Sequence, residues 1–197
     1  GIDSTTLTEY HDTQTVSTDN LSGGRLAFFP PQESGSRADA NYQKNPLPRD
    51  RSYNVLGLGL GFNLASLEVT PADQANIDLF AMWNAILNGR MVFETGKQTE
   101  LLDRHIKEVL AYEDAALDII GSDDGGTGDG FARAIDFPPG LAYRLDEPLL
   151  LESQEKWTLD VEFADTTAIP SDSDWTSFSG SAQELRMIAT LFIAFRD

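Results

Sequence analysis

The sequence predicts an all-β protein with one folded domain and a single inserted α-helix. Two observations carry this prediction. Segments in the C-terminal third alternate apolar and polar residues with a period of two, and polar turns separate them. The chain of 197 residues is also 41% hydrophobic, which is enough for one sizeable core. We expect an N-terminal arm over 1–23 and one β domain over 24–197.

The predicted arm is rich in Thr, Ser and Asp and has few large apolar residues. Such a segment buries too little apolar surface to offset the entropy lost on ordering. We therefore expect residues 1–23 to be disordered in isolation, or to be ordered by a partner.

Strands are predicted where residues of one kind recur at every second position. The predicted strands cover 25–29, 53–67, 90–95, 143–151, 156–164 and 183–196. The second has Leu56, Leu58 and Leu60 on one face and a row of glycines on the other. Glycine weakens a strand unless something must approach the backbone closely, so the glycine face is expected to lie under a neighbouring element.

The one helix is predicted over 71–87. Thr70 provides an N-cap, Pro71 suits the first helical position, and Asn88 with Gly89 ends the helix. Its apolar stripe is expected to pack against the sheet. The segment 98–112 is ambiguous, and we favour a short helix or turn followed by extended structure.

The last predicted strand is apolar on both faces, which is unusual for a sandwich strand. Its second face, with Ile188 and Phe192, therefore predicts a covering helix or a neighbouring subunit. Two long polar loops, 32–52 and 165–180, add further candidates for contacts with a partner. The interface candidates are Ile188, Phe192, Trp175, Phe178, Arg49 and Arg51.

The charge balance is strongly acidic, with 32 acidic and 14 basic residues and a net charge of −18. Nucleic-acid backbones attract clustered Lys and Arg, so the composition predicts no direct nucleic-acid contact. The acidic surface fits either plain solubility or a halophilic protein whose self-repulsion is screened by salt. No segment has the length and hydrophobicity of a membrane-spanning helix, which predicts a soluble chain.

No candidate for catalysis or for a cofactor emerges, so the sequence predicts a non-enzymatic protein. The chain has no cysteine, and its two histidines, His11 and His105, lack the spacing of a metal triad or a catalytic pair. The glycine-rich loop 121–130 contains three weak calcium candidates. They are Asp123, Asp124 and Asp129. The loop lacks the ligand spacing of an EF-hand, so a solvated loop is favoured and calcium binding stays open.

Three segments carry a resemblance to a known family. Residues 143–163 (YRLDEPLLLESQEKWTLDVEF) and 185–195 (LRMIATLFIAF) are separated by a polar loop, and 87–97 (LNGRMVFETGK) contains a strand, a glycine and a charged residue before the next element. This order resembles the closing strands of capsid proteins from tailless icosahedral viruses that contain an internal membrane.

The resemblance implies a single jelly-roll β-barrel or sandwich of the vertical branch, because the chain has room for one barrel. It further implies a structural virion protein, a major capsid protein subunit that self-assembles into an icosahedral shell around the internal membrane. The expected partners are copies of the chain, other capsid proteins and that membrane. The alternative is a carbohydrate-binding jelly-roll module, with Trp175 and Phe178 as its sugar platform.

Overall fold

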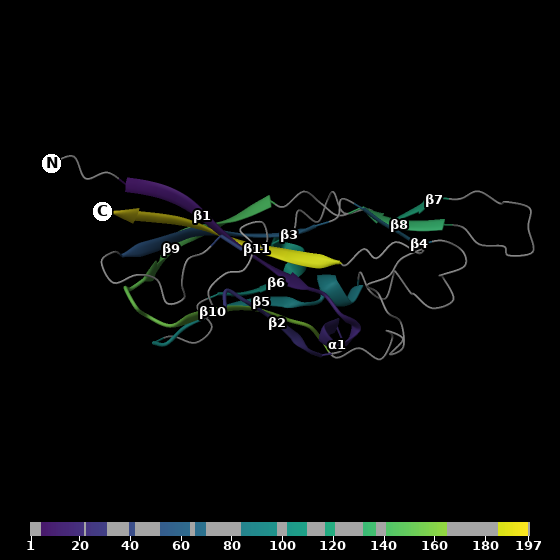
Figure 1. The fold of residues 1–197 in the computed structure, drawn as a ribbon, viewed down its shortest axis with the longest axis horizontal. Helices are drawn as coiled ribbons and strands as arrows, with labels where there is room; N and C mark the ends of the chain where they lie inside the picture. The colour runs from purple at the N-terminus through teal and green to yellow at the C-terminus, as the bar shows by residue number, and fades with distance from the viewer. Residues whose placement is uncertain are drawn as a thin grey trace, which may run out of the picture.

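The computed structural model describes two four-stranded antiparallel sheets, a smaller three-stranded sheet and little helix. The described residues are 5–21, 23–30, 40–41, 52–63, 66–69, 84–97, 102–109, 117–120, 132–136, 141–164 and 185–196. Over these residues the all-β prediction is confirmed. Figure 1 shows the two larger sheets as two layers, with the three-stranded sheet beyond one end of them.

The first large sheet, called sheet A below, has its strands in the order β1 (Thr5–Thr15), β11 (Arg186–Arg196), β3 (Tyr53–Phe62) and β9 (Leu141–Leu151). Sheet B has the order β2 (Arg25–Phe28), β10 (Trp157–Glu162), β5 (Arg90–Thr95) and β6 (Leu102–His105). The third sheet contains β4 (Ser66–Val69), β8 (Ala132–Asp136) and β7 (Leu117–Ile120).

One hydrophobic core joins the facing sides of sheets A and B. On β10, Trp157, Leu159 and Val161 are buried while the residues between them face outward. On β11 the residues from Met187 to Phe195 at every second position are buried in the same way. The period of two predicted for these strands is therefore confirmed.

The segment assigned to the N-terminal arm contains an integral strand of sheet A. All eleven residues of β1 pair antiparallel with β11, and a helical turn, α1 (Thr18–Leu21), follows. The expectation of a disordered or partner-ordered arm is therefore wrong for Thr5–Thr15. The physical reason is that five threonines favour extended backbone, and the ladder to β11 satisfies the backbone without a large apolar content.

The outer edge of β1 is closed in its middle by Asn41. The Asn41 backbone N–H donates to the His11 carbonyl at 3.1 Å, and its side-chain amide donates to the Glu9 carbonyl at 2.8 Å. The His11 N–H donates in turn to Asn41 Oδ1 at 2.6 Å. Asn41 thus occupies backbone groups that an exposed edge offers to another chain.

Strand β3 departs from the predicted faces at Leu56. The cross-strand register skips this residue against both neighbours, which marks a β-bulge. Tyr53 and Val55 before the bulge, and Leu58 and Leu60 after it, are buried in the core. Leu56 is half-buried instead, so its predicted place on one face with Leu58 and Leu60 is wrong.

The end of the predicted helix is confirmed, and most of its length lies outside the described residues. Residues 84–87 form a helical turn that closes with hydrogen bonds from Asn88 and Gly89. Gly89 is needed for space: a Cβ there would lie 2.8 Å from Ile106 Cδ1 and 3.1 Å from Phe163 Cδ1. In 98–112 the order is the reverse of the one predicted, because strand β6 comes first and a helical turn, α3 (Ile106–Val109), follows.

The outer face of sheet B is charged, as expected for a face in contact with water. Arg90 Nε donates to Asp103 Oδ1 at 2.6 Å, and this hydrogen bond holds the pKa of Asp103 below its ordinary value. Asp160 lies 3.5 Å from Arg25, but partial burial, together with the charges of Glu162 and Glu94, raises its pKa.

The raised pKa of Asp160 predicts that Asp160→Asn stabilises the protein at neutral pH. A carboxyl group whose pKa is higher in the folded state favours folding while protonated, and this contribution is lost as the pH rises through the folded-state pKa. The variant should match the wild type near pH 3 and gain at most about 1 kcal/mol above pH 6, or roughly 2–4 °C in Tm. Thermal unfolding at both pH values checks this, and a loss of stability at neutral pH contradicts it.

Candidate functional site

The candidate site is the outer face of sheet A, the face that points away from the core. Residues paired across antiparallel strands point to the same side of a sheet, so the register defines rows across this face. The first row, in strand order, is Leu7, Ala194, Asn54 and Leu150. The second row is Glu9, Phe192, Gly57 and Arg144.

The first row carries the large apolar side chains that are most exposed in the described part of the chain. Leu7 is 71% exposed on β1 and Leu150 is 55% exposed on β9. Further along β11, Phe192 and Ile188 are half-buried. The sequence predicted that Ile188 and Phe192 lie under a helix or a subunit, and the structure leaves both partly open.

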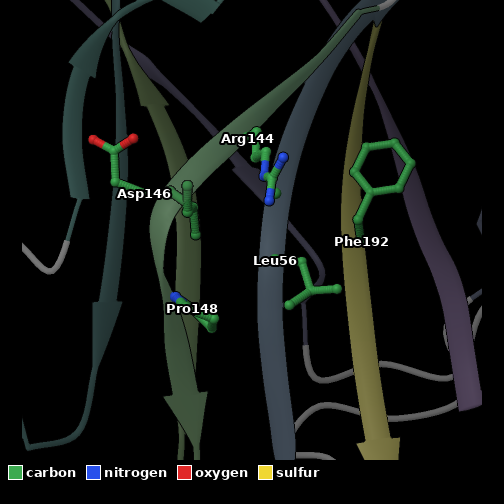
Figure 2. A pocket seen from close by; sticks show the side chains of 7 residues that line it. Leu56, Arg144, Asp146, Pro148 and Phe192 are labelled. Carbon is green, nitrogen blue, oxygen red and sulfur yellow. The ribbon is translucent and has the colours of Figure 1, made fainter. Parts of the chain in front are cut away.

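A hollow of about 400 Å³ opens on this face where three neighbouring strands are irregular. Leu56 is the bulged residue of β3, and β9 inserts residues 145–148 between the partners of Gly57 and Val55. The lining residues are Leu56, Gly57, Arg144, Leu145, Asp146, Pro148 and Phe192. Figure 2 shows Leu56 and Phe192 extending from neighbouring strands, while Asp146 points away from them.

Gly57 explains part of the predicted glycine face. The ring of Phe192 lies beside it, and a Cβ on Gly57 would be 3.6 Å from Phe192 Cδ2 and 2.9 Å from the Tyr143 carbonyl oxygen. A side chain at this position would therefore force β3 and β9 apart. Close approach to Gly57 comes from its own neighbouring strands, β9 above all, and the expected covering element is not needed to account for it.

The second hollow, of about 360 Å³, is more polar and lies beside Leu150. Lys97 donates to the Glu152 carboxylate at its edge, and this bond raises the pKa of Lys97. Both groups are exposed, and an exposed ion pair of this kind contributes little to stability. We therefore assign no separate site to it.

Side chains that could bind a metal ion are not gathered together in the described residues. Over the described ranges, no cluster of three or more His, Asp or Glu side chains is placed to hold a metal ion. His11 lies on β1 and His105 on β6, where His105 Nε2 is 3.1 Å from Arg90 Nη1. The two histidines thus belong to different sheets.

Several residues predicted from sequence lie outside the described residues. They are the interface candidates Trp175, Phe178, Arg49 and Arg51 and the calcium candidates Asp123, Asp124 and Asp129. Conversely, sequence reasoning missed Leu7, Leu150 and Arg144. The signal for Leu7 was a lone leucine among threonines, and it gains meaning only once β1 is placed beside β11.

The fold and this site define an all-β sandwich protein with ion pairs on the outer face of sheet B and exposed apolar side chains on the outer face of sheet A. No family model, no curated protein and no solved structure matches the chain. Among the described segments, none is a helix long and apolar enough to cross a membrane.

Proposed function

We propose that this protein is a structural subunit that associates with copies of itself through the outer face of sheet A. In its specific form, the proposal is a major capsid protein of jelly-roll fold, assembled into an icosahedral virion shell around an internal membrane. The observation that carries it is the pair of exposed leucines, Leu7 and Leu150, together with the hollow beside Phe192 on sheet A, because a sandwich face that stays in water has no need of them.

The pairing of the eight strands supports the jelly-roll part of the proposal. The strands pair as nested partners, first with last and inward: β1 with β11, β2 with β10, β3 with β9 and β5 with β6. A chain folded back as one long hairpin gives this nesting, and winding the hairpin brings β11 beside β3 and β10 beside β5. A jelly roll contains eight strands in two sheets, and capsid proteins use this fold.

The difference between the two outer faces supports association through sheet A. Sheet B presents two ion pairs, Arg25 with Asp160 and Arg90 with Asp103, whose charges would be costly to bury further. Sheet A presents the apolar side chains of Leu7, Leu150 and Phe192. The cores of protein interfaces are depleted in charge and enriched in aromatic residues.

The net charge of −18 makes the proposed assembly dependent on salt. At about 0.1 M salt the Debye length is about 10 Å, and at about 1 M it falls to about 3 Å. Repulsion between acidic subunits is therefore screened in brine, while apolar contacts are retained. This dependence fits a halophilic setting, in which further capsid proteins and a membrane are the proposed partners.

We expect the purified full chain to form species several times heavier than the 21.6 kDa monomer in about 2 M NaCl, and fewer of them in about 0.1 M NaCl. Size-exclusion chromatography with light scattering, over a series of protein concentrations, checks this. A monomer at every salt and protein concentration overturns the proposal.

A carbohydrate-binding module is the second candidate, favoured by the hollow itself. An aromatic ring and a guanidinium, from Phe192 and Arg144, line one small depression. This combination is suited to a sugar ring and its hydroxyl groups. A monomer retained on a polysaccharide column, with retention lost in Phe192→Ala, supports this candidate against the first.

A further inference from the structure

We infer that the outer face of sheet A binds the same face of a second copy. The two copies are related by a two-fold axis that lies between the two facing sheets, runs parallel to the strands and passes over the line between β11 and β3. This inference rests on the proposed function and adds the geometry of one contact. It follows from the order of residues in the rows across the sheet, which is self-complementary about this axis.

Rotation about such an axis keeps each row in place and reverses the order of its residues. A residue on β1 then lies over β9 of the partner subunit, and a residue on β11 lies over β3. Isologous contacts of this kind are the commonest in homo-oligomers. The strands of two packed sheets stay within about 30° of alignment. Residues near the middle of the face therefore stay close to the partner residues that the rotation places over them.

The charges of the second row become complementary in this arrangement. Glu9 and Arg144 are exposed and stand at opposite ends of the row. Within the described part of the chain, neither forms a salt bridge. Rotation places Glu9 over Arg144 of the partner subunit, and the symmetry repeats the contact, so two ion pairs flank the axis.

The apolar groups also meet across the axis. Leu7 comes to lie over Leu150 of the partner subunit, which covers the two most exposed apolar side chains of the described residues. Phe192 comes to lie over Gly57 of the partner subunit, where the hollow provides room for the ring. A large group thus faces a small one, which is how packed faces interdigitate.

The area of the face is sufficient for a specific contact. Four strands about 4.8 Å apart, with about ten residues that each rise about 3.3 Å, give roughly 600 Å² per copy. The total of about 1,200 Å² falls at the lower end of specific interfaces. Edge-to-edge pairing through the middle of β1 is disfavoured by comparison, because Asn41 already occupies those backbone groups.

The test is a charge swap in the full chain, followed by sedimentation velocity at about 0.15 M and about 2 M NaCl. Glu9→Arg and Arg144→Glu each put like charges opposite each other twice, so each is expected to weaken association about tenfold or more at the lower salt. The double variant restores the opposite charges and should return association to within about threefold of the wild type. Glu94→Arg, on the outer face of sheet B, is the matched control and should change association little.

The outcomes separate this inference from the proposed function. If the chain assembles and neither single variant weakens assembly beyond the Glu94→Arg control, the two-fold contact is overturned while the proposed function stands. If the single variants weaken assembly and the double variant does not restore it, the pairing of Glu9 with Arg144 across the axis is overturned. A wild-type chain that stays monomeric overturns both proposals.

Discussion

Trp157→Ala is expected to lower the free energy of unfolding by about 4 kcal/mol, the largest effect of a single substitution that we predict. Trp157 is 3% exposed and lies between two buried rings, with centroid distances of 5.3 Å to Phe29 and 5.8 Å to Phe93. Truncation removes the apolar burial and both ring contacts, and it leaves a cavity between the sheets that rigid strands cannot close. Urea unfolding followed by circular dichroism measures the loss.

Trp157→Phe is the matched control for this substitution. It keeps an aromatic ring between Phe29 and Phe93 and removes less volume, so we expect a loss of about 1–2 kcal/mol. Equal losses for the two variants would show that ring packing does not determine the cost. A loss below about 1 kcal/mol for Trp157→Ala would contradict the position of this residue in the core.

Asp12→Ala is expected to cost about 2–3 kcal/mol through a different mechanism. Asp12 is buried at 5% exposure, and its Oδ2 accepts from the Phe29 backbone N–H at 2.7 Å and from Gln14 Nε2 at 3.0 Å. Phe29 is fully buried with a φ of 54°, a conformation that a bulky side chain rarely adopts. The carboxylate thus holds a strained turn at the end of β2 and joins it to β1 of the other sheet.

Asp12→Asn separates the hydrogen bond from the charge. The amide oxygen can still accept from the Phe29 N–H, so we expect about half of the alanine loss, measured in the same urea series. An alanine variant as stable as the wild type would show that Phe29 keeps its conformation without Asp12. Hydrogen exchange would locate the loss at the junction of β1 and β2 if the backbone amides of these two strands lose protection in the variant.

The strand faces could be predicted from sequence where both faces were distinct. Trp157, Leu159 and Val161 alternate with polar residues, so the period alone gives the buried face of β10. The segment Thr5–Thr15 could not be predicted in this way. Its threonines and backbone ladder make it a strand, and its partner strand, β11, lies 171 to 191 residues away in sequence, from Thr15↔Arg186 to Thr5↔Arg196.

The candidate site was predicted in part. The second apolar face of β11 directed attention to Ile188 and Phe192, which do lie on the face of interest. The bulge at Leu56 and the insertion in β9 were not predictable, because a bulge shifts the period of two without a sequence mark of its own. Glu9 and Arg144 acquire their relation through the register of four strands, which no single segment encodes.

The most direct measurement of the central claim is the mass of the full chain in about 2 M NaCl for Phe192→Ser beside Val92→Ser. Both substitutions replace a half-buried apolar residue on an outer face, the first on sheet A and the second on sheet B. If sheet A is the association face, Phe192→Ser sediments as a monomer and Val92→Ser assembles like the wild type. Assembly that persists in Phe192→Ser and fails in Val92→Ser would contradict the account.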